Sequence, residues 1–99
     1  MTEINSQVKY LNADIDKTKI FAGNRNKAGV YLWTNKINGN TYVGSSSNLS
    51  MRFYSYYSLV SLIKSNRLLE RALLKYGFSN FSLEILEYCN PKDAVKKEQ

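Results

Sequence analysis

The chain between positions 28 and 35 alternates between two kinds of side chain with a period of two, which predicts a β-strand. One side of this strand carries Val30 and Leu32, and the other carries Tyr31 and Trp33. We expect the aliphatic side, together with Val43 of the next apolar segment, to face the core. The aromatic side is then expected to face away from it.

A second strand-like segment, Tyr42-Val43-Gly44, follows the dipeptide Asn38-Gly39. Both residues of that dipeptide tolerate positive φ, which is typical of a two-residue type I′ hairpin loop. Such a loop places Tyr42 opposite Asn35. Tyr31 and Tyr42 then share a face but lie four positions apart along the strands, about 13 Å at the standard rise. Sheet twist, a bulge or a longer loop would be needed to bring the two phenols to one site.

The polar run 45–48 supplies good N-cap residues and predicts the start of a helix. Arg52 and Ser55 lie off the apolar stripe of this helix. The stripe itself, at helical spacing, consists of Leu49, Phe53, Tyr56 or Tyr57, and Val60.

A second helix ends where Gly77 occupies the usual C′ position. Its apolar residues follow i, i+3, i+4, i+7 spacing and are Leu69, Ala72, Leu73 and Tyr76. A third strand follows, in which Phe81, Leu83 and Ile85 alternate with other residues. Asn90-Pro91 reads as the N-cap and N1 of a last helix, which we expect to be truncated because the chain stops at Gln99.

These elements predict an α+β fold (α/β in the broad sense), a small, mainly antiparallel three-stranded sheet flanked by helices in the order β-β-α-α-β-α. Residues 1–27 are expected to form a leader segment, either a short helix or an extended arm, before a C-terminally incomplete domain at 28–99. The leader is polar, with a weak apolar rhythm at Val8, Leu11, Ile15 and Ile20.

Composition restricts the possible chemistry. Fourteen Lys and Arg against eight Asp and Glu give a net charge of +6, which favours a polyanionic partner, nucleic acid before membrane. No apolar run approaches the roughly 20 residues of a membrane span, and the first residues lack the features of a secretion signal or transit peptide. The chain has no histidine and a single cysteine, Cys89, so a Cys/His zinc site, a Ser-His-Asp triad and an internal disulfide are excluded.

Two tripeptides and a spaced arginine together carry a resemblance. Gly29-Val30-Tyr31 and Tyr42-Val43-Gly44, with Arg52 eight positions beyond the second glycine, resemble the signature of the GIY-YIG nucleases. The run 71–89 is similar to the middle of the intron-encoded homing endonucleases of fungal mitochondria. The segment from Tyr10 to Gly29 is similar to the preface seen in that subgroup.

The resemblance implies roles for individual residues. Tyr31 would be the general base or water-positioner, and Tyr42 would assist it by hydrogen bonding. A phenol can deprotonate water only where nearby cations lower its pKa, normally about 10. Arg52 would bind the scissile phosphate, and Glu98 would coordinate Mg²⁺, with Mn²⁺ as an alternative ion. Gly29 and Gly44 would allow close approach of the backbone.

Each role has a simpler alternative. The tyrosines could be strand aromatics that only pack, Arg52 a solvated helix residue, and Glu98 a surface glutamate in a lysine-rich tail. Many family members carry a histidine one helical turn beyond the arginine. Here Tyr56 stands in that place and either substitutes for it or has no role. Polar residues beyond the glutamate and the DNA-recognition region of homing enzymes are absent from the chain, which predicts weak or absent activity.

The expected function is Mg²⁺-dependent hydrolysis of double-stranded DNA by the catalytic domain of a homing endonuclease, without a small-molecule cofactor. The resemblance implies an organelle-encoded mitochondrial protein. One alternative is a nucleic-acid-binding module, for DNA or intron RNA, that lacks catalysis, and another is a structural or protein-interaction domain. Candidate phosphate contacts are Lys36, Lys64, Arg67, Arg71 and Lys75.

Overall fold

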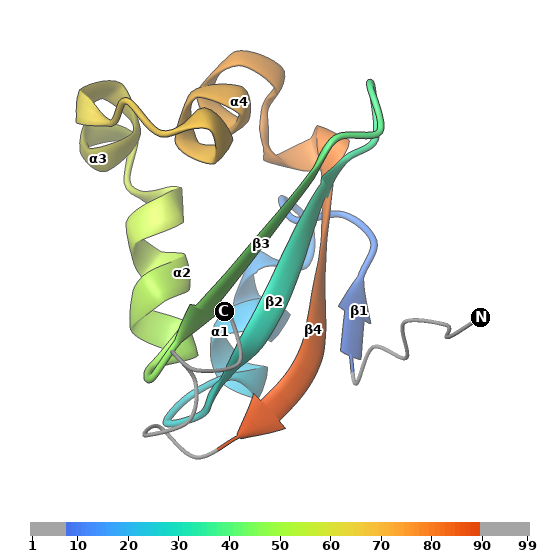
Figure 1. Ribbon diagram of the computed structural model, residues 1–99, viewed down its shortest axis with the longest axis vertical. Coiled ribbons are helices and arrows are strands. Elements are labelled where there is room, and N and C mark those ends of the chain that lie inside the picture. The colour runs from blue at the N-terminus through green and yellow to red at the C-terminus, as the bar shows by residue number, and fades with distance from the viewer. Residues whose placement is uncertain (1–7, 90–99) are drawn as a thin grey trace.

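A four-stranded antiparallel sheet forms the centre of the protein, in a computed structural model that describes residues 8–89 (Figure 1). The strand order is β1-β4-β2-β3, so β1 and β3 are the two edges. The α+β class is confirmed, but the sheet has one strand more than the sequence predicted. The strands are β1 (Val8–Tyr10), β2 (Ala28–Asn35), β3 (Thr41–Ser46) and β4 (Phe81–Cys89).

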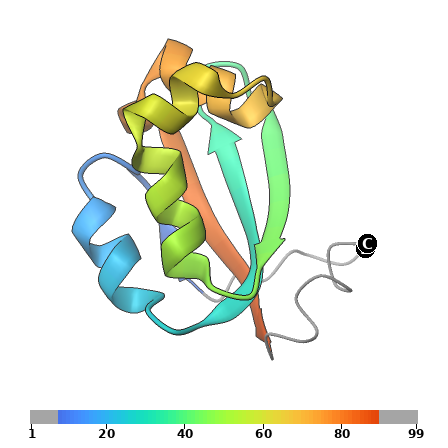
Figure 2. The same ribbon diagram turned by 90° about the vertical axis from the view of Figure 1, so that its left-hand side faces the viewer.

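The helices lie on one face of this sheet and around one of its ends. Figure 2 shows α1 and α2 across that face, with α3 and α4 at the end nearer the β2–β3 hairpin. The helices are α1 (Lys17–Gly23), α2 (Leu49–Tyr57), α3 (Leu59–Lys64) and α4 (Leu68–Tyr76), and a short 3₁₀ turn, Phe78–Asn80, leads into β4. None of the helices in the described residues has the length and apolar character needed to cross a bilayer.

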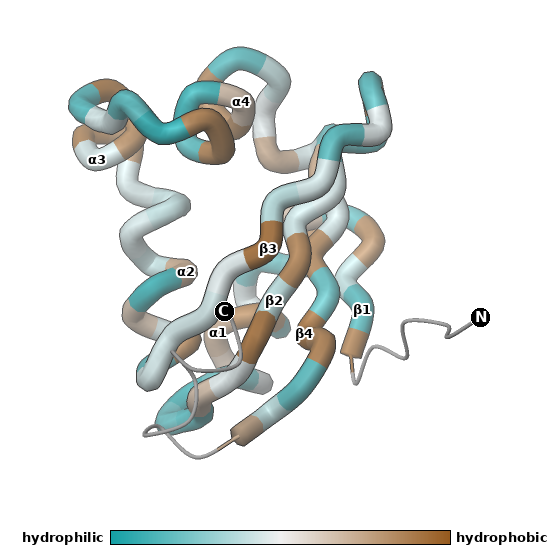
Figure 3. Tube along the Cα trace, viewed as in Figure 1, coloured by the Kyte–Doolittle hydropathy of each residue, from teal (hydrophilic) through white to brown (hydrophobic). Residues whose placement is uncertain are grey.

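The core lies on the aromatic side of β2, and the expectation of an aliphatic core face was wrong. Tyr31 is only 2% exposed and Trp33 is fully buried, whereas Val43 on the opposite face is 57% exposed. The helices cover the aromatic side, where Trp33 packs edge-on against Phe53 and Tyr56 of α2 with ring centroids 6.3 and 5.5 Å apart. Figure 3 shows the alternation of apolar and polar positions along β2 and β4.

The β2–β3 hairpin has a four-residue loop, so the predicted two-residue loop and its register were wrong. Tyr31 pairs with Gly44, and Trp33 pairs with Tyr42. The loop closes at Asn35, whose N–H donates to the carbonyl of Asn40 at 2.8 Å and whose side-chain oxygen accepts from the N–H of Ile37. Tyr42 is therefore a diagonal neighbour of Tyr31 on one face, a position about 7–8 Å away in sheets of this kind.

Residues 8–27 contribute to the same core, although they were expected to form a leader. β1 pairs with β4, Val8 opposite Ile85, and Ile20 of α1 is fully buried. The apolar rhythm predicted for this segment does not form one face, because Leu11 and Ile15 are exposed. The division of the chain into a leader and a domain at position 28 stays a prediction.

The predicted first helix is divided into α2 and α3 at Ser58. The backbone at Ser58 is extended, and its side chain caps α3 by accepting from the N–H of Ser61 at 3.4 Å. This break turns Val60 out to solvent, although it was expected on the apolar stripe. The end of α4 is as predicted: Gly77 has φ +83° and donates its N–H to the carbonyl of Leu73.

The third predicted strand is confirmed as β4, with Phe81, Leu83 and Ile85 fully buried. The observed order of the described elements is β-α-β-β-α-α-α-β, with the short 3₁₀ turn before the last strand. The predicted last helix, with Glu98 in it, lies outside the described residues.

Candidate active site

The hydroxyl of Tyr31 is bonded to two side chains of α2. It lies 2.7 Å from the hydroxyl of Tyr56, where either group can donate, and it accepts from Nε of Arg52 at 3.4 Å. The Tyr31 ring also packs edge-on against Phe53, with centroids 5.2 Å apart. These contacts fix the phenol of Tyr31 in one position at the junction of β2 and α2.

Gly44 makes room for this phenol from across the sheet. A Cβ at this position would come within 2.5 Å of the Tyr31 hydroxyl and 2.6 Å of its Cζ atom. A side chain is also excluded at Gly29, on the β4 side of β2, because an added Cβ would collide with the carbonyl oxygen of Glu87. The β2–β4 register shifts there, between Val30 and Tyr31. Both glycines are therefore required by close approach.

Arg52 is presented to the site by the first turns of α2. The helix starts at Asn48, whose side chain accepts from the N–H of Met51 at 3.3 Å. The guanidinium carbon of Arg52 lies 4.9 Å from the ring centroid of Tyr56. Partial burial lowers the pKa of Arg52, but the hydrogen bond to Tyr31 and the electrostatic interactions with Tyr56 and Tyr31 outweigh it. The pKa of Arg52 is therefore raised. The guanidinium therefore keeps its charge.

Tyr56 supports the same cluster from one helical turn further along α2. Burial raises the pKa of Tyr56 well above its usual value, the neighbouring Tyr31 raises it further, and Arg52 opposes the rise. Tyr56 therefore stays a neutral phenol at ordinary pH, and it can donate a hydrogen bond to the oxygen of Tyr31.

These side chains line a cleft of about 570 Å³ between β3 and the start of α4, called here the Tyr31 cleft. Tyr42 of β3 lines it beside Gly44, so the observed register brings both motif tyrosines to one wall. The remaining polar side chains of the lining include Ser45, Asn66, Arg67 and Glu70.

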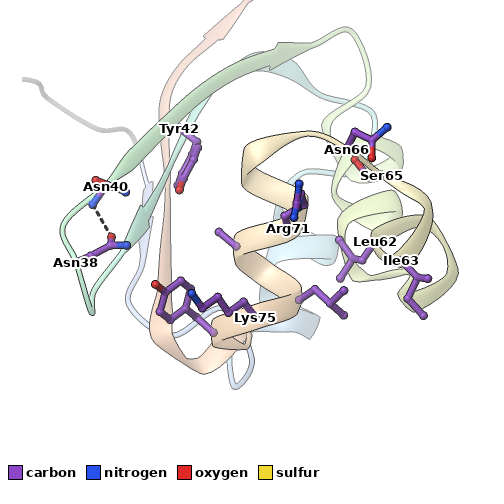
Figure 4. Close-up of a pocket in the computed structure, with 12 residues that line it drawn as sticks. Asn38, Asn40, Tyr42, Leu62, Ile63, Ser65, Asn66, Arg71 and Lys75 are labelled. Atoms are coloured by element: carbon purple, nitrogen blue, oxygen red, sulfur yellow. Dashed lines mark hydrogen bonds between the residues drawn. The ribbon is translucent and has the colours of Figure 1, made fainter.

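A second hollow of about 670 Å³ lies over α4 and adjoins the first, and we call it the α4 hollow. Figure 4 shows Asn38, Asn40 and Tyr42 on the hairpin side of α4, with Arg71 and Lys75 on the helix itself. On the far side the hollow reaches α3 at Leu62 and Ile63.

The predicted phosphate contacts divide between these hollows and the outside. Arg67 lines the Tyr31 cleft, and Arg71 and Lys75 line the α4 hollow. Lys64 lines neither hollow. Lys36 also lines neither, and its ammonium group donates to the carbonyl of Leu11 at 2.8 Å, which ties the hairpin to the segment after β1.

The described residues contain no group of three or more His, Cys, Asp or Glu side chains that could hold a metal ion by themselves. Within residues 8–89, Glu70 is the carboxylate that lines the Tyr31 cleft. Mg²⁺ commonly binds through one or two carboxylates together with substrate phosphates and water, so a cleft with few carboxylates fits this ion. The predicted ligand Glu98 lies outside the described residues.

Comparison with known proteins adds to this geometry. Residues 27–99 match the GIY-YIG catalytic domain, which covers most of the chain. The chain belongs to the GIY-YIG family. The resemblance seen in the two tripeptides and Arg52 is thereby confirmed, and the domain is a nuclease catalytic domain.

Relatives of this GIY-YIG domain come from a phage and a fungus. The chain is 42% identical over 67 residues to the Enterobacteria phage T4 protein named "Putative endonuclease segB", covering 66% of this chain and 26% of that protein. It is 34% identical over 64 residues to the "Probable intron-encoded endonuclease 1" of Neurospora crassa, covering 65% of this chain and 20% of the fungal protein. The chain thus spans about a quarter of the length of one relative and a fifth of the other.

A solved structure shares the fold of this GIY-YIG domain. It is a mutant of the catalytic domain of the intron endonuclease I-TevI, with a TM-score of 0.57 and 29% sequence identity over 73% of this chain and 76% of that one. The likeness extends the family match from sequence to the arrangement of sheet and helices.

Sequence reasoning missed two polar residues that the GIY-YIG fold brings to the Tyr31 cleft, Asn66 and Glu70. Both come from the α3–α4 connection and the first turn of α4, more than twenty positions after Gly44. The apolar stripe of α4 could have placed Glu70 off the core face, but no periodicity indicates that the start of this helix lies near β3.

Proposed function

We propose that this GIY-YIG domain hydrolyses phosphodiester bonds of double-stranded DNA as the catalytic part of an intron-encoded homing endonuclease. The observation that carries the proposal is the cluster of Tyr31, Arg52 and Tyr56 in the wall of an open cleft. Such a cluster offers an oxygen that can hold a water and a permanent positive charge beside it. Phosphodiester hydrolysis requires both functions.

In this proposal Tyr31 positions or deprotonates the attacking water. Arg52 and Tyr56 both have N–H or O–H groups beside its oxygen, and these would stabilise negative charge that develops there. Tyr56 acts through Tyr31, as a positioning residue in the place where many family members carry histidine. Tyr42, on the same wall, would assist by hydrogen bonding to the water or to a phosphate oxygen.

Arg52 is proposed to hold the scissile phosphate. Its Nε donates to Tyr31, and other N–H groups of the guanidinium can bind two phosphate oxygens in the paired geometry that arginine favours. Its charge is retained at any ordinary pH, because its pKa is raised. Arg67 is a second cation in the same cleft.

The proposed metal ion is Mg²⁺, with Mn²⁺ as an alternative, held by Glu98. A bound Mg²⁺ would supply positive charge to the phosphoryl and leaving oxygens. This assignment rests on the match of Glu98 to the family pattern and on the small number of carboxylates that Mg²⁺ requires.

The wider context is also a proposal. The fungal relative named as intron-encoded supports an intron context, while the phage relative gives no support to a mitochondrial location. A DNA-recognition region in the complete protein would account for the short span of this chain against its relatives.

The direct test is hydrolysis of a plasmid with Mg²⁺ and enzyme in excess, so that weak activity is measurable. We expect Tyr31→Phe to cut about 10²–10⁴-fold more slowly, the usual contribution of a general base. Arg52→Ala should lose about 10²–10³-fold, as for removal of a charge-stabilising donor.

Matched controls come from exposed residues of the same types. Tyr54→Phe on α2 and Arg25→Ala after α1 should cut like the wild type, because neither side chain lines the Tyr31 cleft. If Tyr31→Phe and Arg52→Ala also cut like the wild type, the assigned roles are wrong. Salt-sensitive DNA binding without any hydrolysis by the wild type would favour the non-catalytic nucleic-acid-binding module.

A further inference from the structure

The Tyr31 cleft and the α4 hollow adjoin each other and share two lining residues. Tyr42 and Asn66 line both of them, one from β3 and the other from the connection between α3 and α4. A ligand that passes Tyr42 and Asn66 can therefore reach from the cleft to the hollow over α4.

Three cationic side chains line the cleft and the hollow at regular sequence spacing. Arg67, Arg71 and Lys75 are separated by four residues each, so they lie along one side of α4 and the residue before it, about 6 Å apart at the helical rise. Arg67 lines the cleft and the other two line the hollow. None of the three forms an ion pair with another residue of the described range 8–89, and the ammonium group of Lys75 lies 5.2 Å from the ring centroid of Tyr76.

The amide side chains of Asn38 and Asn40 lie on the hairpin side of the hollow, and that of Asn66 lies on the connection between α3 and α4 (Figure 4). Asn38 uses its side-chain oxygen to accept the N–H of Asn40 at 2.9 Å, which leaves its NH₂ group available. The side chains of Asn40 and Asn66 bond to no polar group within residues 8–89. Asparagine amides bind both phosphate oxygens and base edges.

We propose that the α4 hollow binds the DNA strand that continues from the scissile phosphate, with Arg71 and Lys75 on two nearby phosphates of that strand and the hairpin asparagines facing its nucleotides. The cation row spans about 12 Å. At 3.4 Å per nucleotide this corresponds to about three to four nucleotides on one side of the cut. The inference rests on the proposed function, because it takes the Tyr31 cleft as the place of cleavage.

The first test is the salt dependence of binding to a short duplex, without metal so that no cleavage occurs. Each phosphate contact contributes about 0.9 to the slope of log K against log salt concentration. The double variant Arg71→Ala/Lys75→Ala should therefore lower the slope by about 1.8. Lys19→Ala/Arg25→Ala removes the same charge from exposed positions on α1 and just after it, and should lower the slope much less.

The second test locates the contacts on the DNA. A single uncharged methylphosphonate is placed at each position on either side of the cleavage site, and binding is compared between the wild type and the Arg71→Ala/Lys75→Ala variant. We expect weaker wild-type binding for two or three positions on one side only. The double variant should not respond at these positions, because it has already lost the partners of those charges.

The proposal is overturned if the two double variants change the slope equally, or if the sensitive phosphates are the same for the wild type and Arg71→Ala/Lys75→Ala. Neither result depends on hydrolysis. If the slope and the phosphate scan come out as expected but the wild type cuts no DNA with Mg²⁺ or Mn²⁺, the strand-binding site stands and the catalytic proposal fails.

Discussion

At the scale of the residue, the Tyr31 hydroxyl is the point where β2, β3 and α2 meet. Gly44 leaves the space for it, and Arg52 and Tyr56 bond to it. The glycine and the tyrosine of the two tripeptides are thus coupled, since any side chain at position 44 would displace the Tyr31 phenol. This dependence is purely steric and can be tested with one methyl group.

We expect Gly44→Ala to disable cleavage while leaving the protein folded. The new Cβ would lie 2.5 Å from the Tyr31 hydroxyl, so the phenol must shift and its contacts with Arg52 and Tyr56 must lengthen. Overpacking of this kind costs about 1–3 kcal/mol of unfolding free energy. Plasmid cleavage should fall about 10²-fold, the loss that a misplacement of about 1 Å can cause.

The control is Thr41→Ala, an exposed position of the same strand that lies outside the Tyr31 cleft. It should cut normally. Cleavage by Gly44→Ala at the wild-type rate would show that the position of the Tyr31 phenol does not matter for the reaction.

At the scale of the element, α2 carries Arg52 and Tyr56 and is fixed at its start by Asn48. The Asn48 side chain accepts from the N–H of Met51, which satisfies one of the free donors of the first turn. The backbone of Leu49 also donates to the carbonyl of Lys27, just before β2. The start of the helix is therefore tied to the strand that carries Tyr31.

We expect Asn48→Ala to lower the unfolding free energy by about 1 kcal/mol, the usual cost of losing an N-cap side chain. Urea unfolding followed by circular dichroism measures this, and the denaturant midpoint should fall with an unchanged m-value. Ser47→Ala, an exposed neighbour that caps nothing, should unfold like the wild type. Equal midpoints for Asn48→Ala and the wild type would refute the capping role.

The elements with clear periodicity could be predicted from the sequence. β4 and α4 are long and regular, and Gly77 marks the end of α4. β1 could not be predicted, because a three-residue edge strand is too short for its alternation to be distinguished from chance. The expectation of an aliphatic core face on β2 was wrong because Tyr31 and Trp33 form the core side, and aromatic side chains bury more area each.

The candidate site could be predicted only in part. The spacing of the two tripeptides and Arg52 identified side chains that do meet in one cleft. The contact between Tyr56 and Tyr31 depends on how α2 docks on the sheet, which no local pattern encodes. The same holds for Arg67 and Glu70, which reach the cleft through the packing of α4 near β3.

At the scale of the whole molecule, several tyrosines tie separate parts of the chain together through buried or half-buried hydroxyls. The hydroxyl of Tyr57 donates to the carbonyl of Ala13 at 2.6 Å, and that of Tyr88 donates to the side-chain oxygen of Asn24 at 2.8 Å. Burial raises the pKa of Tyr57, with Asp14 and Asp16 adding to the effect. Burial likewise raises the pKa of Tyr88, with a contribution from Tyr10.

These shifts predict alkaline unfolding. A phenol whose pKa is higher in the folded than in the unfolded protein contributes stability fully below the unfolded value, about 10, and loses it as pH rises through the folded value. Urea unfolding from pH 7 to 11.5 should show a constant free energy up to about pH 9 and a decline above pH 10.

The Tyr57→Phe variant distinguishes this cause from a general effect of base. It should be less stable at pH 7, because the hydrogen bond to Ala13 is lost, yet decline less steeply above pH 10. Tyr54→Phe removes an exposed phenol and should follow the wild-type curve. Identical slopes for Tyr57→Phe and the wild type would exclude the buried Tyr57 phenol as a cause.

The four-residue hairpin loop has a consequence beyond the fold. Successive side chains of a strand point to opposite faces, so a slip of the β2–β3 register by one residue would turn Tyr42 out of the wall that holds Tyr31. A slip of two residues would keep the face but slide Tyr42 along the strand by a residue pair. Within this loop Lys36 and Asn38 form side-chain hydrogen bonds and Gly39 supplies the positive φ of the turn, whereas Ile37 is exposed. The loop therefore closes the hairpin in the register that places the two phenols in one cleft.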